Sequence, residues 1–362
     1  MDLSKLRICF LAGTLGQGGA ERQLFYILSA LRQSGADLHL LCLGQNEFWE
    51  DRIKNLGVPI TCVGQPKSKL RRLFRIMTEL RKHPPQVFQS QHFYTSAYVG
   101  VAARLLRLCG IGALRNNGLN EVLANGRIGG CLNLHTPRIM AANSQAAIRY
   151  ATERGVRPER LYFLPNVVDT GQLKPASRRK QNPLRLIAVG RLVQQKRFDR
   201  FLSAVARIRK ETSGEVKAII VGSGPLRAQL EKQAGALGLL PSLVEFRGAV
   251  SDMAPVYAEA DICVLTSDYE GTPNVLLEAM ASGLSVVATK VGGVPEIVWQ
   301  GENGFMVEPG DEASLCAALV HLINDSELRT QMGKNARAYV EANHSLDRLS
   351  TMLSGLYHLA LS

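Results

Sequence analysis

The sequence predicts an α/β protein made of two doubly wound parallel-sheet domains. Its 362 residues suffice for two domains at roughly 150 residues each. Short apolar runs rich in Val, Ile and Leu alternate with helical patterns, which is typical of βαβ units and parallel sheets. The runs are continuously apolar, as expected of strands covered on both faces. Residues 169–183, DTGQLKPASRRKQNP, are polar and without periodicity, so they are expected to link the domains.

Strands are expected throughout an N-terminal domain, residues 1–168, and a C-terminal domain, residues 184–343. In the first domain they fall at 6–13, 38–44, 59–64, 86–90, 111–115, 138–143 and 160–166. In the second they fall at 184–190, 216–224, 243–248, 260–267, 284–290 and 304–309. The remaining segment, 344–362, is expected to form an amphipathic helix with Leu349, Met352, Leu353 and Leu356 on one face. Doubly wound domains bind ligands at the carboxyl ends of their strands, so both domains are expected to face a shared cleft.

The composition is that of a globular protein of the cytoplasm. Apolar residues make up 46% and charged residues 20%, which excludes a disordered chain or a small disulfide scaffold. No run of 18 apolar residues predicts a transmembrane helix, and the start, MDLSKLRICFLAGTL, lacks the pattern of a signal peptide. The seven scattered cysteines form no C-x-x-C pair, so reduced thiols without a metal are expected.

The positive charge of the chain lies entirely in its first half. The net charge is +12, and residues 1–168 hold 22 basic and 10 acidic side chains. The remaining residues hold 21 of each sign. This asymmetry indicates an anionic partner for the first domain only.

The most specific stretch of the sequence is residues 265–298, LTSDYEGTPNVLLEAMASGLSVVATKVGGVPEIV. A helix is expected to begin near Pro273, and its first free N–H groups, those of residues 274–276, would form an anion site. Glu270 and Glu278 flank that site, where their carboxylates can bind the hydroxyls of a sugar and of a ribose. The alternative is an ordinary helix start with an acidic neighbour and one surface glutamate.

Two further segments have the composition of phosphate sites. Gly190 and Arg191 follow the first strand of the second domain, and Lys196 comes five residues later, which suits a pyrophosphate. A solvated surface pair is the alternative. Residues 13–23, GTLGQGGAERQ, lead into a helix near Ala20 without matching G-x-G-x-x-G. Their glycines would let backbone N–H groups approach a phosphate, or would only form a tight turn.

Together these segments resemble glycosyltransferase family 4. The resemblance rests on GGAE (18–21), GRLVQQK (190–196), VGSGPLR (221–227), the E-x(7)-E segment and GGVPEIV (292–298), and it covers nearly the whole chain. It implies the GT-B fold, in which two Rossmann-like domains face a cleft and the last helix returns to the first domain. It also implies retaining transfer of a hexose or N-acetylhexosamine from a nucleoside diphosphate sugar, here expected to be a UDP-sugar. No D-x-D motif is evident, so neither a metal nor a cofactor is expected.

The resemblance also implies roles for single residues of the second domain. Arg191 and Lys196 match the pair that holds the donor pyrophosphate, Glu278 the group that binds the ribose, and Glu270 the group that binds the donor sugar. The residues expected to bind the donor are Gly18, Gly19, Arg191, Lys196, Glu270, Asn274, Val275 and Glu278.

In the first domain, QSQHF (89–93) falls where the family often has a histidine beside the reacting carbon. His92 is therefore expected to be catalytic together with Arg191, Lys196 and Glu270, although a lone histidine at a strand end is otherwise more often structural. Two departures lie on the acceptor side or its hinge. The common N-G-V-D is replaced by NVVD (166–169), and a histidine-glycine found in some members is replaced by RNN (115–117).

Residues 67–83, KSKLRRLFRIMTELRKH, form a basic amphipathic segment. Leu70, Leu73, Phe74, Met77 and Leu80 share one helical stripe, and a helix of this kind is typical of membrane surfaces. The residues expected to contact a membrane or the acceptor are Lys67, Lys69, Arg71, Arg72 and Arg75. Alternatively the stripe packs on the domain's own sheet, and the two roles are compatible.

The leading hypothesis is thus a glycosyltransferase on the inner face of the membrane, acting on a lipid-linked or glycan acceptor in cell-surface polysaccharide biosynthesis. Nucleic acid is not expected as a partner, because no recognition helix, RNP pattern or zinc spacing is present. The alternatives are a nucleotide-sugar epimerase or a phosphorylase on the same architecture, or a non-catalytic subunit that binds a nucleotide sugar.

Overall fold

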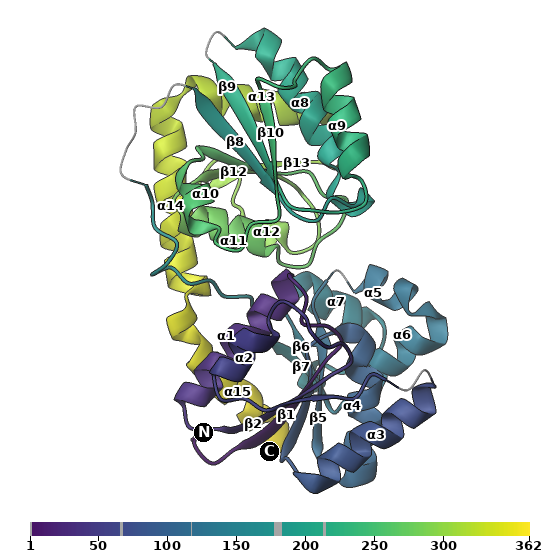
Figure 1. The fold of residues 1–362 in the computed structure, drawn as a ribbon. Helices are drawn as coiled ribbons and strands as arrows, with labels where there is room; N and C mark the ends of the chain where they lie inside the picture. The colour runs from purple at the N-terminus through teal and green to yellow at the C-terminus, as the bar shows by residue number, and fades with distance from the viewer. Residues whose placement is uncertain (1, 66–67, 117, 177–182, 213–214) are drawn as a thin grey trace. The chain divides into compact units, whose positions relative to one another are not determined.

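The structure, a computed structural model of the chain, describes residues 2–65, 68–116, 118–176, 183–212 and 215–362. The chain divides into two compact units. Unit 1 comprises residues 1–167 and 346–362, and unit 2 comprises residues 168–345. Each unit is built on one parallel sheet covered by helices on both faces, so the predicted doubly wound α/β class is confirmed (Figure 1).

The sheet of unit 1 has the strand order β3-β2-β1-β4-β5-β6-β7, all parallel. Its strands are β1 (Arg7–Ala12), β2 (Asp37–Cys42), β3 (Ile60–Cys62), β4 (Val87–Ser90), β5 (Cys109–Leu114), β6 (Ile139–Ala142) and β7 (Leu161–Phe163). Its helices are α1 (Gly19–Gln33), α2 (Glu50–Asn55), α3 (Lys69–Lys82), α4 (Ser96–Leu106), α5 (Leu119–Ala124), α6 (Gly126–His135), α7 (Gln145–Glu153) and α15 (Leu349–Leu361).

Alternation along β1 supplies both cores of this sheet. Ile8 and Phe10 belong to the core that α1, α2 and α15 cover, whereas Cys9 and Leu11 belong to the core that α3 and α4 cover. Successive residues of a strand face opposite sides, so an uninterrupted apolar run fits a sheet that is buried on both.

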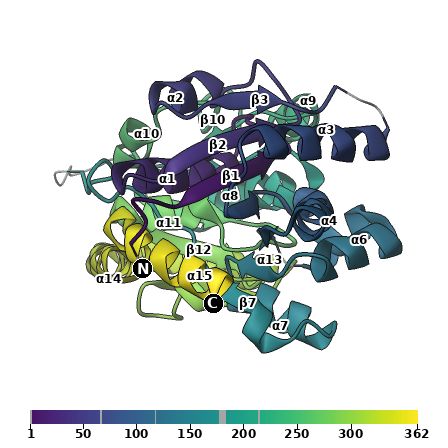
Figure 2. The same ribbon diagram turned by 90° about the horizontal axis from the view of Figure 1, so that it is seen from below.

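The helix α15 packs on unit 1, although it is the last element of the chain (Figure 2). Leu349, Leu353, Leu356 and Tyr357 are buried in the core that α1 also covers. The Tyr357 hydroxyl donates to Oε1 of Gln89 at 2.8 Å, a bond that links the helix to the buried strand β4. The apolar stripe of the final helix thus completes the core of the first unit.

We expect Leu353→Ala to destabilise unit 1 by about 2–5 kcal/mol, because it removes a fully buried side chain and leaves a cavity. Leu361→Ala is the matched control on the same helix, since Leu361 is exposed, and its effect should be within about 0.5 kcal/mol. Chemical denaturation measures both. Equal stability of the two variants would contradict the packing of α15 on this core.

The sheet of unit 2 has the order β10-β9-β8-β11-β12-β13, again all parallel. Its strands are β8 (Leu184–Val189), β9 (Val216–Val221), β10 (Val244–Gly248), β11 (Ile262–Leu265), β12 (Ser285–Thr289) and β13 (Gly304–Val307). Its helices are α8 (Phe198–Glu211), α9 (Arg227–Ala236), α10 (Ala254–Ala258), α11 (Asn274–Ala281), α12 (Val294–Ile297), α13 (Glu312–Asn324) and α14 (Ser326–His344). The helices α8, α9 and α13 share one core with the sheet, and α10, α11 and α14 share the other.

Part of the segment expected to be a linker is packed on unit 2. Leu173 of that segment is buried in its core, and Arg337 of α14 donates to the carbonyl oxygen of Leu173 at 2.7 Å. Val168, expected to end the first domain, is buried in the same core and belongs to unit 2. The polar composition of 169–183 hid the apolar contact of Leu173. Residues 177–182 of the predicted linker lie outside the described residues.

The predicted stripe of α3 is only partly correct. Met77 and Leu80 are buried and Leu73 is half-buried, together with Ile76, which the stripe omitted. Leu70 and Phe74 are instead 77% and 70% exposed. The sheet therefore buries positions 73, 76, 77 and 80, and leaves a second apolar row in solvent. Among the described helices, none is long and apolar enough to cross a bilayer.

Candidate functional site

The candidate residues gather where chain order reverses in each sheet. In unit 1 the reversal lies between β1 and β4, and in unit 2 it lies between β8 and β11. The loops that leave these neighbouring strands diverge to opposite faces, which opens a crevice at the carboxyl edge where doubly wound folds bind ligands. His92 follows β4, Lys196 follows β8 and Glu270 follows β11. The topology therefore places the candidates of each unit at its switch point.

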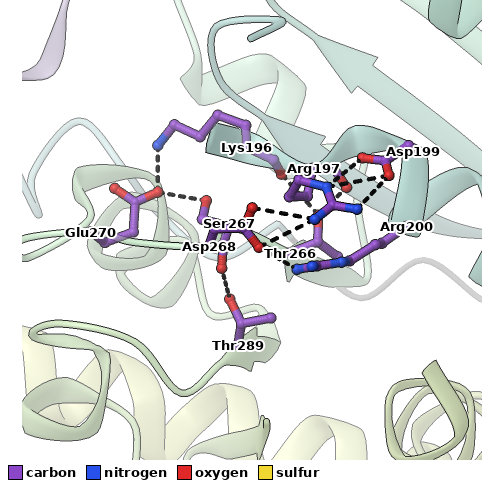
Figure 3. A network of polar contacts seen from close by, with 9 residues as sticks. All are labelled: Lys196, Arg197, Asp199, Arg200, Thr266, Ser267, Asp268, Glu270 and Thr289. Carbon is purple, nitrogen blue, oxygen red and sulfur yellow. Dashed lines mark hydrogen bonds and ion pairs between the residues drawn. The ribbon is translucent and has the colours of Figure 1, made fainter. Parts of the chain in front are cut away.

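A buried ion pair lies at the switch point of unit 2 (Figure 3). Lys196 Nζ lies 2.5 Å from Glu270 Oε1, and the Ser267 hydroxyl donates to the same oxygen at 2.6 Å. The side chain of Lys196 is 15% exposed and that of Glu270 is 8% exposed. Burying a carboxylate is costly unless it is paired and hydrogen-bonded, and here both conditions hold. Sequence reasoning assigned these two residues separate roles, and the structure brings them into direct contact.

The loops that carry this pair are tied together behind it. The Thr266 hydroxyl donates to the carbonyl oxygens of Lys196 and Arg197, at 3.0 and 2.9 Å. Arg197 and Arg200 both bind Asp268, with Nη1 to carboxylate distances of 3.2 and 2.6 Å. Hydrogen bonds and charge from Asp199 and Asp268 raise the pKa of Arg197, which stays protonated. This network, drawn in Figure 3, holds the loop after β8 against the loop after β11.

Arg191 precedes Lys196 by five residues, after the same strand β8. Its side chain is exposed and forms no hydrogen bond or ion pair with any residue that the structure describes. Gly190, which precedes it, lets the Lys196 stem pass close by, since a Cβ there would meet Lys196 Cε at 3.4 Å. A guanidinium without an internal partner at a strand's carboxyl end is available to a phosphate.

The helix α11 begins one residue after Pro273, close to the predicted start. Glu278, on this helix, is buried and accepts a hydrogen bond from the hydroxyl of Tyr257 at 3.0 Å. The alternative of a surface glutamate is therefore wrong. One expected detail is also wrong, because the N–H of Leu276 donates to the carbonyl oxygen of Pro273 at 3.1 Å. Asn274 and Val275 occupy the first turn as predicted and are half-buried.

At the switch point of unit 1, His92 is held through both ring nitrogens. Nδ1 accepts from the N–H of Gly13 at 3.1 Å, and Nε2 lies 3.1 Å from Glu21 Oε1. Since Nδ1 accepts, Nε2 carries the proton and donates to the carboxylate. His92 and Glu21 are both buried. A carboxylate that orients the ring fits the hypothesis of a catalytic histidine. The burial and internal hydrogen bonds fit the alternative of a structural histidine equally.

The glycine-rich turn after β1 shapes this histidine site. The α1 helix begins at Gly19, with Gly18 at its N-cap position, and Glu21 lies in its first turn. A Cβ on Gly18 would lie 2.2 Å from Glu21 Oε2, so a side chain there would displace the carboxylate. The Tyr94 ring stacks on His92 with centroids 5.3 Å apart. Burial, followed by the charge of Glu21, raises the pKa of Tyr94 to about 12.

Sequence reasoning missed three functional side chains. Glu21, Ser267 and Tyr257 bind His92, Glu270 and Glu278 respectively. Glu21 had a signal, since GGAE was already part of the resemblance. The other two had none, because their partners are set by contacts in the folded sheet. Among the described residues, no group of three His, Cys, Asp or Glu side chains could hold a metal ion.

Two family models match this chain. Residues 17–172 match the model described as "Glycosyltransferase Family 4", and residues 183–325 match "Glycosyl transferases group 1". The two matches lie on either side of the segment that separates the predicted domains.

Curated relatives match over roughly half of their length. The N-acetyl-alpha-D-glucosaminyl L-malate synthase of Bacillus anthracis is 30% identical over 200 residues, 55% of this chain and 51% of the relative. The MMP alpha-(1->4)-mannosyltransferase of Mycolicibacterium hassiacum is 31% identical over 232 residues, 62% of this chain and 55% of the relative.

A solved structure shares the fold over nearly the whole chain. Anabaena HepE, solved in complex with UDP and glucose, superposes with a TM-score of 0.85 and 22% identity. The match covers 98% of this chain and 99% of that one. The fold of this chain thus recurs in a solved structure.

Proposed function

The chain belongs to glycosyltransferase family 4, and from that premise we propose that it transfers a hexose or N-acetylhexosamine from a UDP-sugar. The proposed acceptor is a lipid-linked molecule or a glycan, and the proposed stereochemical outcome is retention at the anomeric carbon. The names of the two curated relatives, a glucosaminyl and a mannosyl enzyme, support a sugar of this class. The UDP in the HepE complex supports uracil as the base of the donor.

The observation that carries the proposal is the buried Lys196–Glu270 pair at the β8/β11 switch point. One side chain supplies a cation for the diphosphate and the other a carboxylate for the sugar hydroxyls. Because the two side chains are in contact, one donor molecule can reach both of them. Arg191, exposed beside them, provides a second cation.

The proposed chemistry depends on stabilising the departing nucleoside diphosphate. Negative charge grows on the diphosphate as the bond from the anomeric carbon breaks, and preorganised positive groups stabilise that charge. Lys196, Arg191 and the start of α11 supply this field in unit 2. The acceptor hydroxyl oxygen attacks the anomeric carbon on the face from which the diphosphate departs, so the new C–O bond forms as the bond to the diphosphate breaks, and the hydroxyl proton passes to the departing phosphate oxygen. His92, oriented by Glu21, is the proposed catalytic group of unit 1.

A thermal-shift panel of nucleotide sugars, followed by a transfer assay, tests this function. We expect UDP-sugars to stabilise the protein more than GDP- or ADP-sugars, by RT ln(1 + [L]/Kd) at each concentration. Radiolabelled sugar should then appear on an acceptor. Release of an isomerised free sugar would indicate an epimerase instead, and binding without turnover on any acceptor would indicate a non-catalytic subunit.

We expect transfer to proceed without an added divalent metal, because guanidinium, ammonium and helix N–H groups occupy the role of a metal at the diphosphate. The measurement is turnover in EDTA, compared with turnover after magnesium or manganese is restored. Rates within about twofold of each other are expected. Activity abolished by EDTA and recovered with either ion would contradict the proposal.

We also propose that α3 docks unit 1 on an anionic membrane at the cytoplasmic face, where a lipid-linked acceptor would lie. Lys69, Arg71, Leu70 and Phe74 are exposed on this helix, so cationic and apolar groups share one surface. Arg72 and Arg75 are half-buried on the same helix, and Lys67 lies outside the described residues. Basic groups attract the lipid phosphates, and an inserted Leu or Phe side chain adds hydrophobic stabilisation.

We expect the quadruple variant Lys69→Gln, Arg71→Gln, Arg72→Gln and Arg75→Gln to lose binding to anionic vesicles in flotation. Each basic group near the bilayer contributes on the order of 1 kcal/mol, so the affinity for anionic vesicles should fall by at least about 100-fold. The control carries the same charge change on unit 2, at Arg207, Arg209, Lys210 and Lys217. Equal binding to neutral vesicles, or no loss in the α3 variant, would contradict membrane docking.

A further inference from the structure

Unit 1 holds a cavity of about 560 Å³ at the edge of its sheet opposite to His92. It lies at the amino ends of β5 and β6, where Gly110 and Ile139 form part of its wall. The end of α4, the loop after α6 and the end of α15 also line it. All strands of a parallel sheet begin at the same edge and end at the opposite one. The length of the strands therefore separates this cavity from the switch point, which lies at their carboxyl ends.

The lining of this cavity is strongly cationic. Four arginines line it, namely Arg104, Arg138, Arg157 and Arg160. His135 adds a titratable ring, and Glu159 is the one acidic side chain in the lining. The remaining lining is largely apolar or small. An arrangement of this kind matches general ligand sites, in which a few polar groups converge on an otherwise apolar pocket of 300–1,000 Å³.

The four arginines have different states. Arg160 donates to the carbonyl oxygens of His135 at 2.8 Å, Arg138 at 3.1 Å and Pro137, so it holds the loop before β6. Burial lowers the pKa of Arg160, and the charges of Arg157 and Arg104 lower it further, which shows that these cations are close together. The side chains of Arg104, Arg138 and Arg157 are exposed and form no ion pair with any described residue.

Unpaired cations brought together around one cavity repel one another unless an anion enters. By contrast, Arg197, Arg200 and Arg247 of unit 2 each pair with a carboxylate. The excess charge of the first half of the sequence is thus concentrated here as well as on α3. The cavity is distinct from the proposed donor site. It lies at the amino ends of strands in unit 1, whereas the proposed donor residues follow the carboxyl ends of β8 and β11 in unit 2.

We propose that this cavity, which we name the arginine cavity, binds a phosphate monoester. Guanidinium groups recognise phosphate oxygens in a bidentate manner, and three free guanidinium groups match a group with about two negative charges at neutral pH. The volume admits a small phosphorylated molecule or the headgroup of an anionic lipid. Binding here does not depend on the proposed transfer reaction.

Calorimetry with glycerol 3-phosphate, in excess UDP to occupy any donor site, tests the proposal on the full chain. The variant is Arg104→Gln, Arg138→Gln and Arg157→Gln, all at exposed positions whose replacement leaves the fold intact. The control is Arg127→Gln, Arg149→Gln and Arg154→Gln, exposed arginines of unit 1 outside the lining. We expect the affinity of the variant to fall at least about 10-fold, because it loses charge-assisted hydrogen bonds to the phosphate, and that of the control to change less than about twofold.

A second arm distinguishes the two sources of the phosphate. Vesicles of phosphatidylcholine with phosphatidic acid present the same group on a membrane, and flotation compares the same three proteins. Loss of binding in the variant but not in the control, in either arm, supports the arginine cavity and identifies its ligand as soluble or lipid. If the variant and the control bind glycerol 3-phosphate and the vesicles equally well, or if the wild-type chain binds neither, the proposal is overturned.

Discussion

Lys196→Ala is expected to weaken UDP binding by about 1.5–3 kcal/mol, the range for a charge-assisted hydrogen bond. This corresponds to roughly a 10- to 100-fold rise in Kd by calorimetry. The same change leaves Glu270 buried with Ser267 as its remaining partner among the described residues, so unit 2 should also lose about 3 kcal/mol of stability. Binding and folding are therefore both affected, and they must be separated.

The double variant Lys196→Met with Glu270→Gln separates them. It removes both charges at once, so most of the stability should return, whereas UDP-sugar turnover should remain lost. Arg207→Ala is the matched control, because Arg207 forms an exposed pair with Glu211 on α8 at 3.0 Å. That variant should cost less than about 1 kcal/mol and leave UDP affinity unchanged. Wild-type affinity in a folded Lys196→Ala protein would exclude this lysine from the donor site.

The strands could be predicted from the sequence because their signal is local. An apolar run such as LRLIAVG at 184–190 has to be covered on both faces, and glycine or polar residues end it at the carboxyl edge. β8 occupies Leu184–Val189 within that run. The switch points depend on strand order, which the structure supplies. The loops after β8 and β11 were expected to carry the donor residues because of their motifs and the family resemblance.

The contacts between distant residues could not be predicted in the same way. His92 and Glu21 are 71 positions apart, and only the pairing of β1 with β4 brings them together. The periodicity of α3 likewise identified apolar positions without showing which arc meets the sheet, so Phe74 was placed in the stripe and lies in solvent. The burial of Glu278 depends on Tyr257, which arrives from α10.

Glycines at the site show how tightly the loops of unit 2 are packed. A Cβ on Gly222 would lie 1.9 Å from the carbonyl oxygen of Gly190, so the loops after β9 and β8 approach each other at the backbone. Gly292, in the loop after β12, has the same relation to Glu270. These positions accept no side chain because the neighbouring main chain occupies its space.

Gly292→Ala is therefore expected to disrupt the site more than any other single methyl group added to unit 2. Its φ is +53°, and its Cβ would lie 1.8 Å from the carbonyl oxygen of Glu270, so the loop that carries this carboxylate has to move. A shift of Glu270 separates it from Lys196, and we expect turnover to fall by about 100-fold, as for a misplaced catalytic group. Turnover and UDP affinity are measured on the folded variant.

Gly301→Ala is the matched control for the backbone strain alone. Gly301 has a φ of +79°, yet a Cβ there would meet nothing within 4 Å. Both variants bear the left-handed conformation, which costs a non-glycine residue roughly 1–2 kcal/mol, but only Gly292→Ala also displaces Glu270. We expect Gly301→Ala to lower stability by that amount with turnover unchanged. If the two variants lost turnover equally, strain in the unit rather than the position of Glu270 would be responsible, and the role of Glu270 at the donor sugar would lose this support.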